Sequence, residues 1–149
     1  MRVYHSSSNK INRKSFPYRL FERAKKFGVW NPADIDFSQD RKDWNTLTEA
    51  QRKEMTKLIA YFIGAEEAVT HDIVPLIMTC ANKGWIEEEI YLTTFLFEEA
   101  KHVDFWYLLM ENLGITEDLS PLIEEGHHLL FNATEVTMKR LRHDQSPEA

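Results

Sequence analysis

Residues 85–112 read WIEEEIYLTTFLFEEAKHVDFWYLLMEN, a long stretch without proline or glycine. Its apolar residues recur at helical spacing, so it predicts one long helix with an apolar face. At about 100° per residue, Leu92 and Trp106 lie within about 20° of Glu99 around this helix. Glu99 is therefore predicted on the apolar face, and His102, about 60° away, on the same face. A carboxylate and an imidazole one helical turn apart can bind one metal ion together.

The preceding segment carries a second acid in the same kind of position. Two overlapping capping boxes, Thr46–Glu49 and Thr48–Gln51, predict the start of a helix that ends near Lys83-Gly84. Glu66 points along the centre of the apolar stripe of that helix. Burying a bare carboxylate costs on the order of several kcal/mol unless a cation or hydrogen-bond donors compensate. Two such acids and a histidine on consecutive helices therefore predict a shared metal ion.

Two other interpretations of these acids stay open from the residues alone. Lys57 or Arg52 could extend toward the acids and form a polar network in the core. The acids could also lie on other helix faces than the spacing indicates. Neither alternative requires a metal.

Two further pairs have the same spacing: Glu124/His127 and Glu125/His128. They fall in a third predicted helix, residues 120–131, which starts at a Ser-Pro pair suited to a helix N-terminus. All four side chains lie about 100° or more from the centre of the apolar stripe of that helix. We therefore expect them on a solvated face rather than at a second metal site.

The composition bounds the class of protein. The chain has 149 residues, 43% of them hydrophobic, and a net charge of −6, which gives no reason to expect a nucleic-acid partner. Cys80 is the only cysteine, so an intrachain disulfide is excluded and a buried thiol is expected. No secretory signal and no apolar run of roughly 18 residues occur, so we expect no membrane span. These features predict a soluble, cytoplasmic protein.

The remaining segments complete the predicted organisation of one domain over residues 1–149. Residues 1–17 read as a polar arm, and a short helix is expected over residues 18–27. Residues 30–37 read as an extended lead-in, because the proline among them blocks a helix. Residues 143–149 look like a linker. No strand-like alternation and no internal repeat occur, so the predicted fold class is all-α.

Three motifs in one order carry a resemblance to a known family. They are WNPADIDFS at 30–38, GAEEAVT at 64–70 and YLTTFLFEEAKH at 91–102. With these motifs the chain resembles the ferritin-like small (beta) subunits of class I ribonucleotide reductase. It is most similar to their relatives, the ligand-binding oxidases with a mixed manganese/iron centre. The resemblance implies a ferritin-like helical bundle, of which this chain is the N-terminal half.

The resemblance also implies roles for single residues. Glu66, Glu99 and His102 match metal ligands. Val69 matches a valine that becomes linked through its β-carbon to a tyrosine by an ether bond, and Trp30 matches a tryptophan used for electron transfer. Reductase subunits usually place a radical-bearing tyrosine four residues after the ligand histidine, where this chain has tryptophan instead. This departure favours the oxidase branch.

The function that the resemblance implies is oxygen activation at a dinuclear centre of manganese and iron, or alternatively of two irons. In the oxidase branch such a centre carries out a two-electron oxidation of a bound, fatty-acid-like hydrophobic ligand. The first alternative is a ribonucleotide reductase small subunit, which generates a radical for deoxyribonucleotide synthesis. The second is a non-catalytic helical interaction module.

The donors named so far make up only half of such a site. A ferritin-like dinuclear site takes a glutamate from each of two helices and a Glu-x-x-His pair from each of two more. In the relatives the other ligands lie in a C-terminal half. The chain is therefore expected to be a fragment of a longer one, to pair with a second copy as a homodimer, or to be a degenerate helical protein. By itself it is expected to be poorly active.

Overall fold

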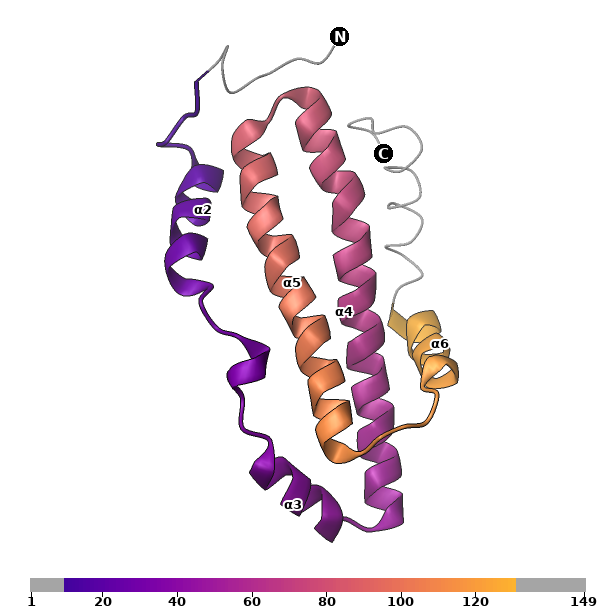
Figure 1. The fold of residues 1–149 in the computed structure, drawn as a ribbon. Coiled ribbons are helices and arrows are strands. Elements are labelled where there is room, and N and C mark those ends of the chain that lie inside the picture. The colour runs from indigo at the N-terminus through magenta and orange to yellow at the C-terminus, as the bar shows by residue number, and fades with distance from the viewer. Residues whose placement is uncertain (1–9, 131–149) are drawn as a thin grey trace. The chain divides into compact units, whose positions relative to one another are not determined.

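The computed structural model of the chain describes residues 10–130, with side chains described for residues 10–126. This part of the chain is helical and contains no strand, as the sequence predicts (Figure 1). The elements are α2 (Phe16–Phe27), the 3-10 helix η1 (Pro32–Asp34), α3 (Ser38–Thr46), α4 (Glu49–Lys83), α5 (Ile86–Leu113) and α6 (Ser120–Leu130).

The described residues divide into two compact units that share the two long helices. The first unit contains residues 10–29 and 70–98, and the second contains residues 30–69 and 99–130. Each unit therefore holds one part of α4 and one part of α5. In the first unit α2 lies beside α5 (Figure 1), and the backbone N–H of Asn12 donates to the carboxylate of Glu87.

The ends of α4 and α5 follow the local signals in the sequence. The capping box that forms is the second of the two predicted: Gln51 N donates to Thr48 Oγ1 at 3.3 Å, and Thr48 N donates to Gln51 Oε1 at 2.9 Å. Each helix ends before a glycine in the left-handed region, Gly84 with φ of 73° and Gly114 with φ of 71°. The two long helices are thus bounded by the residues that the sequence indicates.

The structure corrects two predictions about the N-terminal segment and adds one helix. The polar arm was predicted to run to residue 17, but α2 already begins at Phe16, because Ser15 Oγ accepts from Tyr18 N at 3.3 Å and Pro17 suits the first turn. The lead-in over residues 30–37 contains η1, whose start is capped by Asn31 Oδ1. Helix α3 was not predicted at all, because its polar sequence has no apolar stripe.

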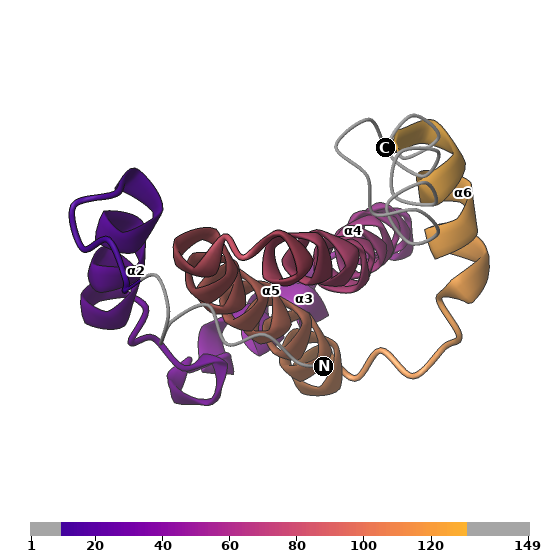
Figure 2. The ribbon, with the colours of Figure 1, turned by 90° about the horizontal axis from the view of Figure 1, so that it is seen from above.

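The core of the second unit forms where α5, α6 and the loop between them pack on α4. Ile59, Ala60, Ile63 and Leu119 are its buried residues. Helix α6 lies beside α4, as Figure 2 shows from above. The approach is close at Gly126: a Cβ added there would lie 2.5 Å from the ring of Tyr61 on α4. A glycine that lowers helix propensity therefore permits close helix packing.

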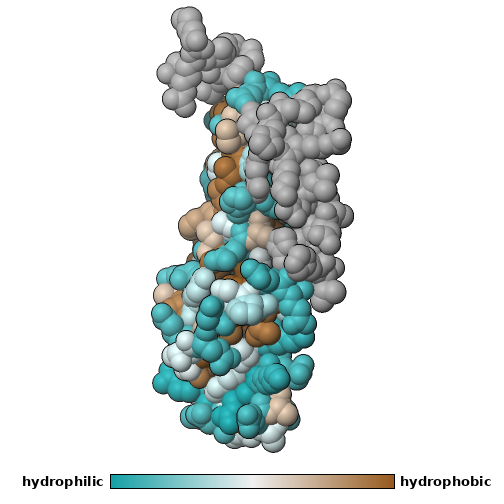
Figure 3. Space-filling model, turned by 90° about the vertical axis from the view of Figure 1, so that its right-hand side faces the viewer, coloured by the Kyte–Doolittle hydropathy of each residue, from teal (hydrophilic) through white to brown (hydrophobic). Residues whose placement is uncertain are grey.

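Many large apolar side chains stay exposed among the described residues. Space-filling Figure 3 shows hydrophobic surface between hydrophilic patches on one face of the chain. In the second unit the exposed apolar side chains on α4 are those of Met55, Leu58 and Phe62. The sequence indicates that these helix faces need more cover than the third predicted helix supplies. No helix within residues 10–130 is long and apolar enough to cross a membrane.

Candidate metal centre

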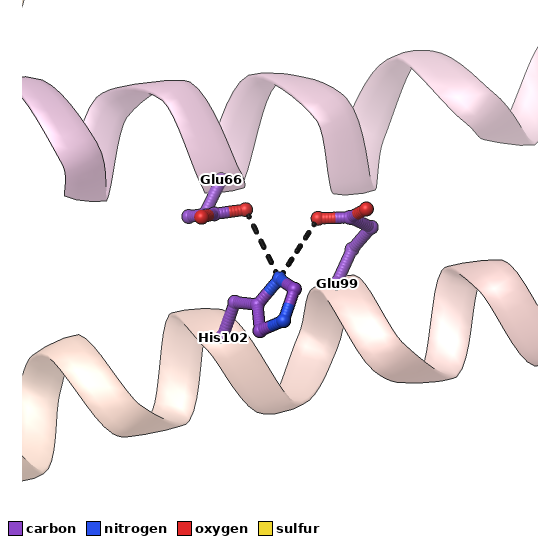
Figure 4. A group of neighbouring side chains, drawn as sticks. All are labelled: Glu66, Glu99 and His102. Carbon is purple, nitrogen blue, oxygen red and sulfur yellow. Dashed lines mark hydrogen bonds and ion pairs between the residues drawn. The ribbon is translucent and has the colours of Figure 1, made fainter. Parts of the chain in front are cut away.

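The three predicted metal ligands lie in the second unit and come from two helices. Glu66 is on α4, and Glu99 and His102 are one turn apart on α5. Their side chains point toward one another in the space between the two helices (Figure 4). One ligand atom from each residue can be chosen so that all lie within 4.8 Å of one another. The tertiary structure thus brings together an acid and a Glu-x-x-His pair more than thirty residues apart.

His102 is the centre of this cluster. Its Nδ1 lies 3.2 Å from Glu99 Oε2 and 3.4 Å from Glu66 Oε2 (Figure 4). An imidazole beside two carboxylates is held by charge attraction when it is protonated, and it can bind a metal when it is neutral. A bound metal ion would place a positive charge between the two acids.

The acids of the cluster are more enclosed than the histidine. The side chain of Glu99 is 12% exposed, that of Glu66 21% and that of His102 41%. Burial and the hydrogen bond with Glu99 raise the pKa of the Glu66 carboxyl, although nearby His102 acts in the opposite direction. The cluster is therefore a site where a second negative charge is disfavoured unless a cation is present.

These donors fit a manganese or iron ion. Carboxylate oxygens with one imidazole are a donor set that suits divalent manganese and iron, whereas copper(I) and iron–sulfur clusters prefer thiolates. The described chain has only Cys80 as a thiol, and it is buried, as predicted, with its pKa raised by burial. Glu66, Glu99 and His102 are the one group of three or more potential ligands within residues 10–126.

One of the two cations that could form a polar network with the acids, Lys57, has another partner. Lys57 Nζ donates to Glu125 Oε1 on α6 at 2.8 Å, so this lysine serves the opposite side of α4 from the cluster. That ion pair raises the pKa of Lys57 and lowers the pKa of Glu125. Arg52 is half-buried and lines a polar pocket with Lys57 and Glu125.

The other Glu-x-x-His candidates differ from the cluster. Glu124 and Glu125 are exposed, as predicted, and the side chains of His127 and His128 fall outside the described residues. His71 is exposed as well, with its Nδ1 3.2 Å from Asp72.

Trp30 and Lys101 form the outer surroundings of His102. The indole of Trp30 stacks on the imidazole with ring centroids 5.6 Å apart and planes at 28°. Lys101 Nζ lies 4.8 Å from the centroid of the same indole and donates to Trp30 O at 3.2 Å. Sequence reasoning singled out Trp30 through the resemblance but missed Lys101, because nothing in a linear pattern reveals a contact across 71 positions.

Two more residues lie near the cluster in sequence. Val69 is half-buried on α4, three residues after Glu66, and its ether cross-link stays a prediction. Trp106, four residues after His102, stacks on Phe62 with centroids 4.8 Å apart. The neighbouring hydroxyl of Tyr107 donates to Glu67 Oε1 at 3.2 Å and therefore faces a different acid from the two of the cluster.

Comparison with known protein families identifies the family of this chain. Residues 18–135 match the family described as ribonucleotide reductase, small chain. The chain belongs to this family. The match confirms the relationship to ribonucleotide reductase small subunits that the three sequence motifs predict.

Solved structures of R2-like ligand-binding oxidases are similar to the chain over almost its whole length. One, a tyrosine-to-phenylalanine variant with an aerobically reconstituted Mn/Fe cofactor, is 38% identical with a TM-score of 0.89, and the match covers 99% of this chain and 55% of that one. The oxidase from Sulfolobus acidocaldarius is 35% identical with a TM-score of 0.88, over 98% of this chain and 54% of that one. A glycine-to-leucine variant with a non-activated Mn/Mn cofactor is 38% identical, with a TM-score of 0.89, over 99% and 55%.

These similarities confirm the predicted fold class, an all-α fold of the ferritin-like R2 type, and its relation to oxidases with Mn/Fe cofactors. The chain spans about half the length of the solved relatives, 55% in the first case.

Proposed function

We propose that this chain is part of a dinuclear metal oxidase in which Glu66, Glu99 and His102 bind manganese and iron. The observation that carries the proposal is the convergence of their ligand atoms within 4.8 Å. The Mn/Fe cofactors of the similar oxidases support the choice of metals, and a pair of irons is the alternative.

Each of the three residues has a distinct part in this proposal. The carboxylates of Glu66 and Glu99 supply hard oxygen donors and the negative charge that a divalent cation neutralises. His102 supplies a nitrogen donor, and Trp30 stacked on it restricts the orientation of its ring. When bound, the metal pair would supply the reduction of O2 and two oxidising equivalents for an organic molecule.

The organic ligand that fits the second unit is apolar. A pocket of about 310 Å³ lies between α3, α4 and α5, with its apolar lining from Trp44, Leu47, Met55, Leu58, Ile59, Phe105, Trp106, Leu109 and Leu113. Trp106 connects this pocket to Phe62, which precedes Glu66 by one helical turn. We propose that a fatty-acid-like hydrophobic ligand occupies this side of the site and is oxidised by two electrons.

Two other functions remain as alternatives. The family match supports a ribonucleotide reductase small subunit. Two features favour the oxidase over that alternative: Trp106 stands in the usual position of the radical tyrosine, and the hydroxyl of the exposed Tyr107 is hydrogen-bonded to Glu67. A non-catalytic helical interaction module would need no metal, and two partly buried acids that converge on one histidine argue against it.

The rest of the dinuclear site must come from other helices. One glutamate and one Glu-x-x-His pair are half of the ferritin-like donor set. We propose that residues 1–149 belong to one ferritin-like domain in the cytoplasm. Its other donors come from a C-terminal half of the protein or, in a homodimer, from the same residues of a second copy, which would also cover the exposed side chains of Met55, Leu58 and Phe62.

Metal content and mass in solution test these proposals together. The purified 149-residue chain would be reconstituted with Mn²⁺ and Fe²⁺, passed through a desalting column and measured by elemental analysis and light scattering. Two metal ions per dimer would support completion by a second copy, and one ion per monomer would support completion by a C-terminal half. A chain that retains no metal, whether it is a monomer or a dimer, would refute the proposed metal site.

Glu99→Gln and Glu124→Gln form a matched pair for the same measurement. Both glutamates begin a Glu-x-x-His spacing, but only Glu99 is buried beside a second acid. We expect Glu99→Gln to abolish retained metal and Glu124→Gln to retain it. Equal loss in both variants would show that the bound metal is adventitious.

A further inference from the structure

The side chain of Lys101 is unusual because it is a buried cation next to a predicted metal site. Lys101 is 8% exposed although a lysine is rarely buried to this extent. Its Nζ donates to the carbonyl oxygen of Trp30 and lies over the face of the indole.

The indole of Trp30 contacts two consecutive residues of α5. Lys101 and His102 differ by about 100° around the helix, so both can reach one ring that lies along the helix surface. The imidazole of His102 stacks on the ring, and the ammonium of Lys101 lies 4.8 Å from its centroid. The backbone after Trp30 is fixed as well, because Pro32 is fully buried and Asn31 caps η1.

A cation over an indole face has two physical effects. It attracts the negative face of the neutral ring, which holds the ring in place. It repels the positive charge that the ring acquires when it loses one electron, and low water access makes this repulsion stronger. The same lysine therefore fixes Trp30 against His102 and makes Trp30 harder to oxidise.

We propose that Lys101 is a positioning residue that holds Trp30 over His102 and suppresses one-electron oxidation of the indole. This proposal rests on the proposed function for its purpose: oxidising equivalents produced at the metal centre would be kept from leaking into Trp30 and would stay available for the organic ligand. The resemblance implies that Trp30 transfers electrons, and Lys101 would then limit this electron transfer.

The test is direct photo-oxidation of the metal-free 149-residue chain. A flash-generated ruthenium(III) tris-bipyridine takes one electron from the indole and becomes ruthenium(II), and the indole radical cation then releases its Nε1 proton to water. The rate constant would be read by transient absorption for each Lys101 variant with Trp30 and with Trp30→Phe. The difference isolates Trp30 from Trp44, Trp85 and Trp106.

Three substitutions separate charge from shape. We expect Lys101→Met to raise the rate constant of Trp30 oxidation by about tenfold, because a unit charge near the ring is removed. Lys101→Arg keeps the charge and should retain the parent rate constant. Lys53→Met changes an exposed lysine on α4, alters net charge equally and should have no effect.

Lys101→Gln is a second uncharged variant, which allows the test even where Lys101→Met does not fold. Glutamine can still donate to Trp30 O but carries no charge, so it should also oxidise about tenfold faster, with helix content verified by circular dichroism. Equal rate constants for the parent, Lys101→Met and Lys101→Gln would overturn the proposal, as would an arginine variant that behaves like methionine. Because the chain is metal-free throughout, failure here is distinct from failure to bind metal.

Discussion

Helices α5 and α6 carry the same Glu-x-x-His spacing in different surroundings. On α5, Glu99 is buried and faces Glu66 of α4, with His102 between them. On α6, Glu124 and Glu125 are exposed, and Glu125 pairs with Lys57. The Glu-x-x-His spacing identifies residues that can bind one metal ion together. Burial and a second acid that faces them create the need for a cation.

The largest expected effect is on metal affinity. Glu99→Gln removes one of the two charged oxygen donors, so we expect the Kd for Mn²⁺ to rise by more than about 100-fold, beyond what loss of an outer contact causes. Glu124→Gln should leave the Kd within about twofold, since surface changes away from a site have small effects. Isothermal titration calorimetry of both variants would check this. A similar rise for the two glutamates would break the contrast between the helices.

The next effect is the stability that metal binding adds. A ligand that binds only the folded state stabilises it by about 2.7 kcal/mol at a free concentration of one hundred times Kd. We expect the chain with Mn²⁺ to gain a stability of this order in urea unfolding, and Glu66→Gln to lose most of it. Glu125→Gln, on α6, should show the full gain. If Mn²⁺ stabilised Glu66→Gln as much as the parent chain, the proposed metal site would be contradicted.

A third prediction sharpens the packing role of α6. Gly126→Ala would raise the intrinsic helix propensity of α6, yet its Cβ would lie 2.5 Å from the ring of Tyr61. We expect a net destabilisation of about 1–3 kcal/mol, as for other overpacked contacts. Thermal unfolding with and without Mn²⁺ would show the loss, while the Mn²⁺ Kd of the folded protein should stay unchanged. A stabilised variant would mean that α6 does not pack this closely.

The smallest expected effect is a difference in pH dependence between two acids. The pKa of Glu66 is raised above its ordinary 4.5, so its contribution favours folding at low pH and is lost as pH rises through the raised value. The pKa of Glu125 is lowered from 4.5, mainly by its hydrogen bond with Lys57, so its contribution is present above 4.5 and is lost as pH falls.

Unfolding midpoints of the metal-free chain between about pH 3 and pH 7 would compare Glu66→Gln and Glu125→Gln with the parent. Relative to the parent, Glu66→Gln should gain stability as pH rises, and Glu125→Gln should gain stability as pH falls. Slopes of the same sign in both variants would refute the electrostatic contrast.

The elements with strong local signals were predicted well. Capping residues and terminal glycines bound α4 and α5, and the apolar spacing of α5 predicts the shared face of Glu99 and His102. Helix α3 was missed because its nine residues contain few apolar side chains, and only its surroundings decide its conformation. The start of α2 was misplaced because Ser15 acts as the cap from outside the predicted helix.

The sequence by itself determined an all-α chain, the two long helices and the three residues proposed as metal ligands, because helical periodicity and capping are local properties. Only the tertiary structure decided that Glu66 meets Glu99 and His102, that Lys57 pairs with Glu125, and that Lys101 holds Trp30 over His102. These contacts join residues far apart in the chain, and they depend on how the helices pack, which no local pattern specifies.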